Sequence, residues 1–114
     1  LKTMGLADVL RSALAPLSAH ITAAFVYGSV ARQQDTAQSD VDVMVVSDNL
    51  GYGELFGALE AATVSLGRTV NPTLYTPADW DKRVQQDSAF VARVWQQPKI
   101  WLIGSEEQLH APST

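Results

Sequence analysis

The sequence has no cysteine, few basic residues and no long apolar run, and each absence excludes a class of protein. Without cysteine, neither a disulfide framework nor a thiolate metal site can form, and a reducing cytoplasm is the simplest compartment to expect. Lys and Arg number 8 against 12 Asp and Glu, so the formal net charge of −4 disfavours tight nucleic-acid binding through a basic surface. No apolar stretch approaches the roughly 20 residues of a membrane span, so we expect no membrane segment.

What is present predicts one folded domain. Apolar residues make up 46% of the 114 residues, which is enough apolar surface to offset the entropy of ordering a chain. Single domains commonly have roughly 100–200 residues, so we expect a single domain over residues 1–114. The chain begins at Leu1 rather than at Met, which leaves open that it is a fragment of a longer protein.

Hydrophobic periodicity predicts helices that alternate with strands. Apolar residues recur at helical spacing in some segments, whereas short runs of β-branched and aromatic residues in others indicate strands. The expected helices cover residues 6–17, which Pro16 should end, and 52–66, followed by helices that begin near residues 77, 89 and 105; the expected strands are 21–27, 41–46, 69–76 and 99–103. This order predicts an α/β (α+β) fold in which one mixed β-sheet is flanked by helices.

Prolines, glycines and hydroxyl residues predict where several elements begin or end. Pro72 has no backbone donor, so residues 69–76 are expected to form an edge strand or an irregular strand. Gly67 stands where a helix C-terminal cap is expected. Thr76 and Ser88 are predicted to cap the helices that follow them, because a hydroxyl oxygen can accept from a free N–H group in the first turn.

Two aspartates stand at the start of a predicted strand. Asp40 and Asp42 are two positions apart, so both side chains project from the same face of the strand. Neighbouring carboxylates repel each other and resist desolvation, and a divalent cation between them removes both penalties. Hard oxygen ligands suit Mg²⁺, which takes its remaining oxygens from water and phosphates. The pair is therefore a candidate metal site.

A glycine turn ends the preceding predicted strand. Gly28 allows the backbone to approach a ligand closely, and Ser29 supplies a hydroxyl and can begin a short helix. Free N–H groups at a helix start bind anions, and the guanidinium of Arg32 could contact the same phosphates. A phosphate cradle beside metal-binding carboxylates is what nucleotide–Mg²⁺ chemistry requires.

Together these two blocks resemble the signature of the polymerase-β-like nucleotidyltransferases, in particular the minimal nucleotidyltransferases. The resemblance extends over residues 21–103, and its specificity lies in Gly28-Ser29-x-Ala31-Arg32 and Ser39-Asp40-x-Asp42. It implies a palm-like nucleotidyltransferase fold in which Gly28 and Ser29 bind a nucleoside triphosphate. It also implies that Asp40 and Asp42 are catalytic and bind Mg²⁺ or Mn²⁺, with Arg32 and Ser39 as further candidate nucleotide contacts.

The sequence departs from that family where a third acid is expected. Asn71 stands on the strand where the family pattern places Asp, and Asn is neutral and cannot act as a base. In a two-metal displacement, each charged group that stabilises the attacking and leaving oxygens contributes several kcal/mol. Replacing the third carboxylate by Asn71 should therefore lower the rate of catalysis more than the affinity for the nucleotide. Asp48, Asp79 or Asp81 could substitute, although nothing in the sequence places them at the site.

Several of these residues also have structural interpretations. Arg32 could instead form a salt bridge with Asp35 or Asp42, and Ser39 could cap the turn rather than touch a ligand. The large aromatic residues of the C-terminal half are expected to be core or partner contacts rather than a base-stacking platform; these are Trp80, Phe90, Trp95 and Trp101.

Two functional hypotheses follow from the resemblance. The first is a Mg²⁺-dependent nucleotidyltransferase that moves a nucleoside monophosphate from an NTP to a hydroxyl on a protein, RNA or small molecule. The second, motivated by Asn71, is a catalytically impaired nucleotide-sensing or antitoxin-like module. The family implies a helical toxin partner, or a fused DNA-binding domain in a transcriptional regulator. A homodimer is left open.

Overall fold

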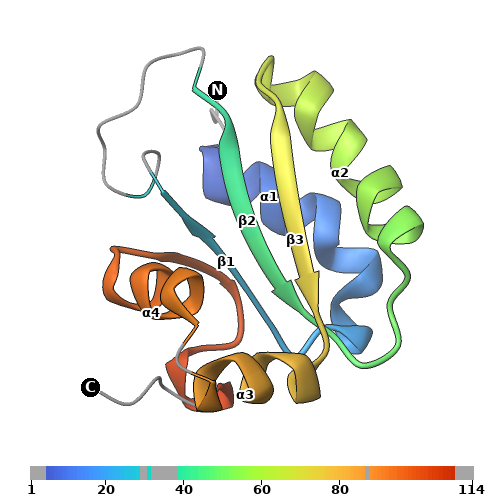
Figure 1. Cartoon of the computed structure of the whole chain (residues 1–114). Helices are drawn as coiled ribbons and strands as arrows, with labels where there is room; N and C mark the ends of the chain where they lie inside the picture. The colour runs from blue at the N-terminus through green and yellow to red at the C-terminus, as the bar shows by residue number, and fades with distance from the viewer. Residues whose placement is uncertain (1–4, 29–30, 32–38, 87, 110–114) are drawn as a thin grey trace.

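The computed structural model describes residues 5–28, 31, 39–86 and 88–109, and its helices and strands alternate as the sequence predicts (Figure 1). In chain order the elements are α1 (Leu6–Leu14), the 3-10 helix η1 (Ala15–His20), β1 (Ala23–Tyr27), β2 (Val41–Val46), α2 (Tyr52–Leu66), β3 (Val70–Tyr75), α3 (Pro77–Gln85), α4 (Ala89–Gln96), β4 (Ile100–Ile103) and the 3-10 helix η2 (Glu106–Gln108). No helix in this described part has the length and apolar character that crossing a membrane requires.

The four strands form one mixed sheet in the order β3-β2-β1-β4, which confirms the predicted fold class. β1 is antiparallel to both β2 and β4, whereas β2 and β3 are parallel and are connected by the crossover helix α2. β3 is an edge strand, as Pro72 predicts. The Val41 and Ser47 N–H groups donate to the carbonyls of Thr69 and Tyr75, so the odd-numbered residues of β3 direct their backbone polar groups towards β2. The even-numbered residues, including Pro72, direct theirs towards the free edge, where the missing N–H of Pro72 interrupts no hydrogen bond of the sheet.

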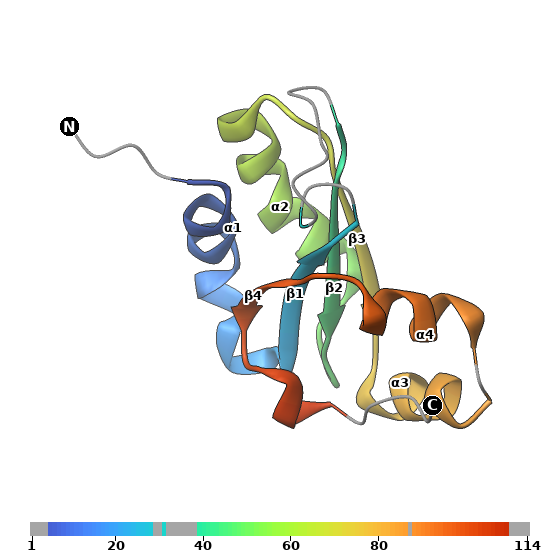
Figure 2. The same ribbon diagram turned by 90° about the vertical axis from the view of Figure 1, so that its left-hand side faces the viewer.

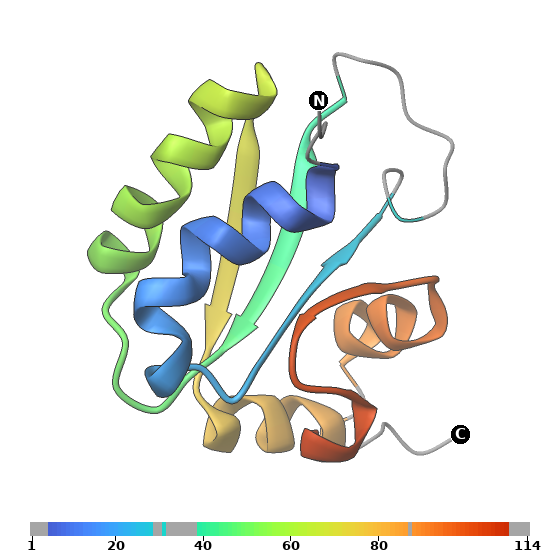
Figure 3. The same cartoon turned by 180° about the vertical axis from the view of Figure 1, so that it is seen from behind.

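Helices cover both faces of the sheet. α1 and α2 pack side by side across one face, and they lie nearest the viewer in Figure 3. α3 and α4 lie on the other face of the sheet, as Figure 2 shows. Alternating strand residues supply the two cores. The α1/α2 core includes Val26, Val41, Val43, Val45, Leu10, Leu14, Leu55 and Leu59. The α3/α4 core includes Phe25, Met44, Val46, Trp80, Val84, Val91 and Val94.

The predicted aromatic packing is observed in the second core. Trp80 is fully buried, and its ring centroid lies 5.9 Å from that of Trp95. The Phe25 and Trp101 centroids are 4.9 Å apart. These rings, together with the half-buried Phe90, join α3 and α4 to the sheet, to which Trp101 belongs through β4, so they stabilise the fold and do not form an open stacking platform.

The ends of the elements agree with the predicted caps. The Thr76 hydroxyl accepts from the Asp79 N–H at 3.0 Å, and Ser88 accepts from the Val91 N–H at 3.5 Å. Gly67 ends α2 with a φ of 66°, in the left-handed region that favours glycine. The first helix is shorter than predicted: the α-helix ends at Leu14, and a 3-10 helix that contains Pro16 follows, because proline cannot donate the next α-helical hydrogen bond.

Candidate functional site

Both predicted metal-binding aspartates lie at the N-terminal end of β2. Asp42 projects from the same face as Met44 and Val46, which is the α3/α4 face, and Asp40 is two residues earlier. α3 lies against the opposite end of this face, whereas the first turn of α4 approaches the end of β1 through Phe90, whose ring centroid lies 6.2 Å from that of Tyr27; neither helix covers Asp40 (Figure 2). Asp40 is therefore exposed and Asp42 half-buried, an arrangement that a ligand in solution can reach.

β3 brings Asn71 to this pair. The parallel register places Asn71 directly beside Asp42. The Asn71 side-chain Nδ2 donates to Asp40 Oδ2 at 3.0 Å. Three side chains from two strands thus meet at one end of the sheet, although Asn71 is 31 positions from Asp40 in the chain.

Gly28 approaches the same carboxylate from β1. The antiparallel register pairs Tyr27 with Asp42, so the turn after β1 begins beside the aspartate. Gly28 has a φ of 82°, and a Cβ added there would lie 2.6 Å from Asp42 Oδ2. Only glycine fits this close contact without displacing the carboxylate. The other two predicted residues of the turn, Ser29 and Arg32, lie outside the described residues.

The start of β2 is held in place from β3. The Arg68 Nε donates to the backbone carbonyl of Ser39 at 3.0 Å, and the Val41 N–H donates to the Thr69 carbonyl at 2.9 Å. These bonds fix the backbone on both sides of Asp40. Ser39 is half-buried at this position, and a contact between its hydroxyl and a nucleotide stays a prediction.

The electrostatics of the pair favour a bound cation. Burial raises the pKa of Asp42, and the neighbouring charge of Asp40 raises this pKa further. Both causes penalise two ionised carboxylates, and a divalent cation between them offsets both. Two carboxylates and one amide oxygen are hard oxygen ligands of the kind that Mg²⁺ and Mn²⁺ accept. The described residues contain no group of three or more His, Cys, Asp or Glu suited to a metal. At this site the third position is the neutral Asn71.

Two polar side chains beside the aspartates were not identified from the sequence. The Tyr27 hydroxyl lies 3.4 Å from Thr73 Oγ1, and either oxygen could be the donor. Burial raises the pKa of Tyr27, so its hydroxyl stays protonated and can donate. Thr73 is two residues after Asn71 on the same face of β3, and Tyr27 precedes Gly28, so strand alternation applied to the predicted site would have found both.

The alternative acids lie at the wrong end of the sheet. Asp48 follows the C-terminal end of β2, and Asp79 and Asp81 belong to α3, which follows β3. A strand rises about 3.3 Å per residue, so β2 separates its two ends by roughly 20 Å. Because β2 and β3 are parallel, none of the three carboxylates reaches the Asp40–Asp42 pair, and none replaces the missing third acid.

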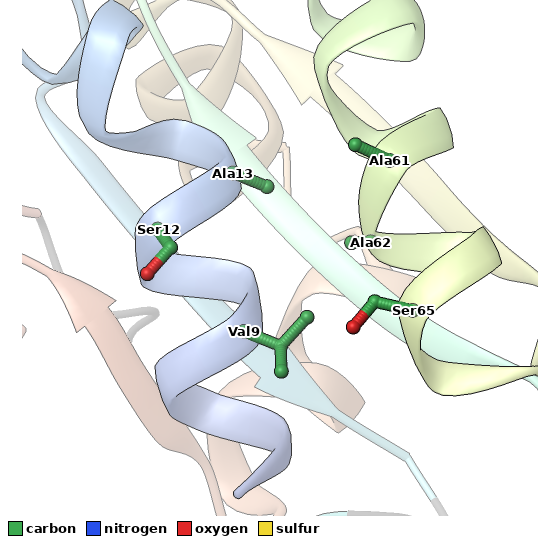
Figure 4. Close-up of a pocket in the computed structure, with 6 residues that line it drawn as sticks. All are labelled: Val9, Ser12, Ala13, Ala61, Ala62 and Ser65. Carbon is green, nitrogen blue, oxygen red and sulfur yellow. The ribbon is translucent and has the colours of Figure 1, made fainter. Parts of the chain in front are cut away.

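Two hollows lie away from the carboxylates. A cavity of about 300 Å³ between α1 and α2 is lined by small side chains, among which only Ser12 and Ser65 are polar (Figure 4). It lies on the face of the sheet opposite Asp40 and carries no charge. A second hollow, of about 350 Å³, lies between α2 and β3 and reaches Asn71. Of these two hollows, only the second shares a residue with the candidate site, and it does so at the edge of the sheet, because α2 lies on the other face.

Comparison with known proteins gives one family and a shared fold. The family model described as polymerase beta, nucleotidyltransferase matches residues 12–79, well over half of the chain, including Gly28, both aspartates and Asn71. No curated protein matches the chain.

Two solved structures have the same fold at low sequence identity. One is described as a toxin–antitoxin with AMP-PNP; it has a TM-score of 0.63 and 16% identity, and the match covers 89% of this chain and 75% of that one. The other is a mutant of the toxin–antitoxin MntA–HpeT in which two aspartates, two positions apart, are replaced by glutamate. Its TM-score is 0.60 and its identity 15%, and the match covers 91% of this chain and 76% of that one.

Proposed function

Because the chain belongs to the polymerase β nucleotidyltransferase family, we propose that it binds a nucleoside triphosphate with a divalent cation and transfers the nucleoside monophosphate to a hydroxyl acceptor. The observation that carries the proposal is the meeting of Gly28 and the half-buried Asp42, with the exposed Asp40 beside them, at one end of the sheet. The arrangement places a turn whose backbone can come close to phosphates beside two carboxylates that can hold a cation.

Each residue has a distinct role in the proposal. Asp40 and Asp42 would hold Mg²⁺ or Mn²⁺, which neutralises charge on the phosphates and on the leaving pyrophosphate. The turn at Gly28 and Ser29 would bind the triphosphate, with Arg32 and Ser39 as further contacts. The acceptor oxygen attacks the α-phosphorus, the bond to the pyrophosphate oxygen breaks, and the acceptor proton passes to solvent or to a neighbouring base.

The similar structures support a nucleotide ligand and a protein partner. One of them was crystallised with AMP-PNP, and both are toxin–antitoxin proteins. In one, a pair of aspartates with the spacing of Asp40 and Asp42 was the target of mutation. We propose a helical toxin as partner and acceptor, with a fused DNA-binding domain in a regulator as the alternative context; the cytoplasm and a homodimer stay predictions.

Calorimetry with ATP and GTP in the presence of Mg²⁺ tests the binding step. We expect Asp42→Asn to weaken nucleotide binding at least about tenfold, because half of the metal-binding charge is lost. Asp48→Asn makes the same charge change at the far end of β2 and should leave the affinity unchanged. Equal affinities for the wild type and Asp42→Asn would refute the proposed site.

Transfer is tested separately with NTPs that carry a labelled α-phosphate. The label should enter a protein or RNA of a bacterial lysate only when Mg²⁺ or Mn²⁺ is present, and Asp40→Ala should abolish this labelling. If no acceptor is labelled and Asp40→Ala changes nothing, the transferase assignment fails.

The hydrogen bond from Asn71 favours a second candidate function, which is nucleotide binding without transfer. The Asn71 amide is neutral and occupies Asp40 Oδ2, where the family pattern has a third charged ligand. Asn71→Asp should then create or accelerate transfer, while nucleotide affinity changes less, because a third carboxylate restores the charge that clamps the reacting oxygens. If the wild type turns over as fast as Asn71→Asp, the chain is an active transferase and this second candidate is rejected.

A further inference from the structure

The outer flank of α2 has an unusual surface. Three large apolar side chains are exposed in the described part of the chain, and all belong to this helix: Tyr52 is 53% exposed, Phe56 45% and Val64 83%. Residues four apart lie on one side of a helix, so Tyr52 and Phe56 are neighbours, and their rings stack at a centroid distance of 6.1 Å. Clustered exposed apolar side chains mark interaction sites.

This flank borders the 350 Å³ hollow, which we call the α2–β3 groove. Phe56, Leu59, Glu60 and Val64 line it from α2, and Val70 and Asn71 line it from β3. α2 runs alongside β3 at one edge of the sheet (Figure 1). The groove therefore extends from an exposed apolar helix flank to a residue that contacts the Asp40 carboxylate.

Glu60 is the charged side chain of this flank. It is exposed and lies four residues after Phe56 and four before Val64, whereas Glu54 lies on the other side of the helix; α2 contains no Lys or Arg. Glu60 lies in the groove and forms no ion pair with any described residue. The faces of exposed aromatic rings attract cations as well. A complementary partner therefore presents a basic side chain flanked by apolar ones.

Two other occupants fit less well. A second copy of the chain docked symmetrically would bring acidic α2 flanks together without a basic residue of that helix to neutralise them. An extended peptide added to β3 would need backbone donors along the free edge, and Pro72 removes the donor at the middle of that edge. A helix makes no use of the edge donors and needs only the apolar flank.

We propose that the α2–β3 groove docks a short amphipathic helix of a partner protein, which inserts apolar side chains between α2 and β3 and pairs a Lys or Arg with Glu60. From Tyr52 to Val64 the flank is about 18 Å long, so it matches roughly three turns of a partner helix. Such a helix ends beside Asn71. The docking does not depend on nucleotide chemistry; that the docked protein is also the acceptor rests on the proposed function.

A synthetic helix of about 15 residues, with leucine on one face and lysine on the other, is the probe. Its binding to the full chain is measured by fluorescence polarisation at physiological salt. We expect Glu60→Lys to weaken binding at least about tenfold, because a charge attraction becomes a repulsion. Glu107→Lys makes the same charge change in η2, away from α2, and should alter the affinity less than about twofold.

Further variants separate the apolar contribution and the nucleotide site. Val64→Ser removes an exposed apolar side chain without disturbing the core, and it should also weaken binding. Asp42→Asn should bind the probe like the wild type even though it loses nucleotide affinity, so failure of the docking and failure of the proposed function are distinguishable. Amide chemical shifts of the wild type should change along residues 52–70.

Three results would overturn the inference. Equal weakening by Glu60→Lys and Glu107→Lys would show that the probe senses only the net charge of the chain. Equal binding of a version of the probe with glutamate in place of lysine would refute charge complementarity. A dimer that Val64→Ser dissociates, seen by light scattering, would assign the groove to a second copy.

Discussion

Gly28 sets how closely the backbone after β1 approaches the Asp42 carboxylate. An added Cβ would lie 2.6 Å from Asp42 Oδ2, and the φ of 82° is itself unfavourable for other residues. We expect Gly28→Ala to lower the free energy of unfolding by about 1–2 kcal/mol from the backbone conformation. It should also displace Asp42 and lower the affinity for Mg²⁺ and nucleotide, which calorimetry measures.

Gly67 provides the matched control for this substitution. It has a φ of 66°, but a Cβ added there has no heavy atom within 4 Å. Gly67→Ala should therefore cost a similar free energy of unfolding and leave cation binding unchanged. Equal losses of cation affinity in the two variants would mean that general destabilisation, and not the contact with Asp42, is responsible.

Asp42 also gives the metal-free protein a predictable pH dependence. Burial, and then Asp40, raise its pKa above the ordinary value of 3.8, so the folded state binds this proton more tightly than the unfolded state does. The free energy of unfolding therefore falls as the pH rises through the raised pKa. Asp42→Asn should stabilise the metal-free protein at neutral pH, and this gain should shrink as the pH approaches 3.8.

Urea unfolding with EDTA across this pH range measures the effect. Asp48→Asn is the control, because Asp48 is exposed on the turn after β2. If Asp42→Asn destabilises the metal-free protein at neutral pH, the ionised carboxylate makes favourable contacts that outweigh its desolvation.

Among the elements, β3 is an edge strand with a proline in its middle. Pro72 turns to the free edge, where it interrupts the row of donors that another strand could use. Pro72→Val should change the free energy of unfolding by about 1 kcal/mol or less, because β-propensity differences are of that size. Self-association of the chain should increase, as measured by light scattering. Pro98→Val, between α4 and β4, should not have this effect.

Most element boundaries were predictable because they depend on local chemistry. The bounds of β2 and α2 agree with the prediction at every residue, since a valine-rich run, interrupted by Asp42 and Met44, specifies the strand and Gly67 caps the helix. The end of the first helix was predicted less well. Apolar spacing continues to Leu17, but the backbone after Leu14 adopts 3-10 geometry around Pro16, and apolar spacing does not distinguish the two helix types.

At the scale of the whole molecule, nucleotide and cation binding should stabilise the fold by linkage. A ligand at 100 times its Kd that binds only the folded state contributes about 2.7 kcal/mol. For a domain of this size, that corresponds to a rise in Tm of roughly 10 °C or more. A thermal scan should show this rise with Mg²⁺ and ATP together, and not with ATP and EDTA. Asp42→Asn should remove most of it.

The sequence by itself determined the alternation of helices and strands, the caps, and the shared face of Asp40 and Asp42, because each follows from backbone geometry within a few residues. It also identified Asn71 as the departure from the family pattern. Only the tertiary structure decided what Asn71 contacts. The parallel pairing of β2 with β3 brings its amide to Asp40 and keeps Asp48 and Asp79 at the other end of the sheet. Strand order and register depend on packing between distant segments, which no local pattern specifies.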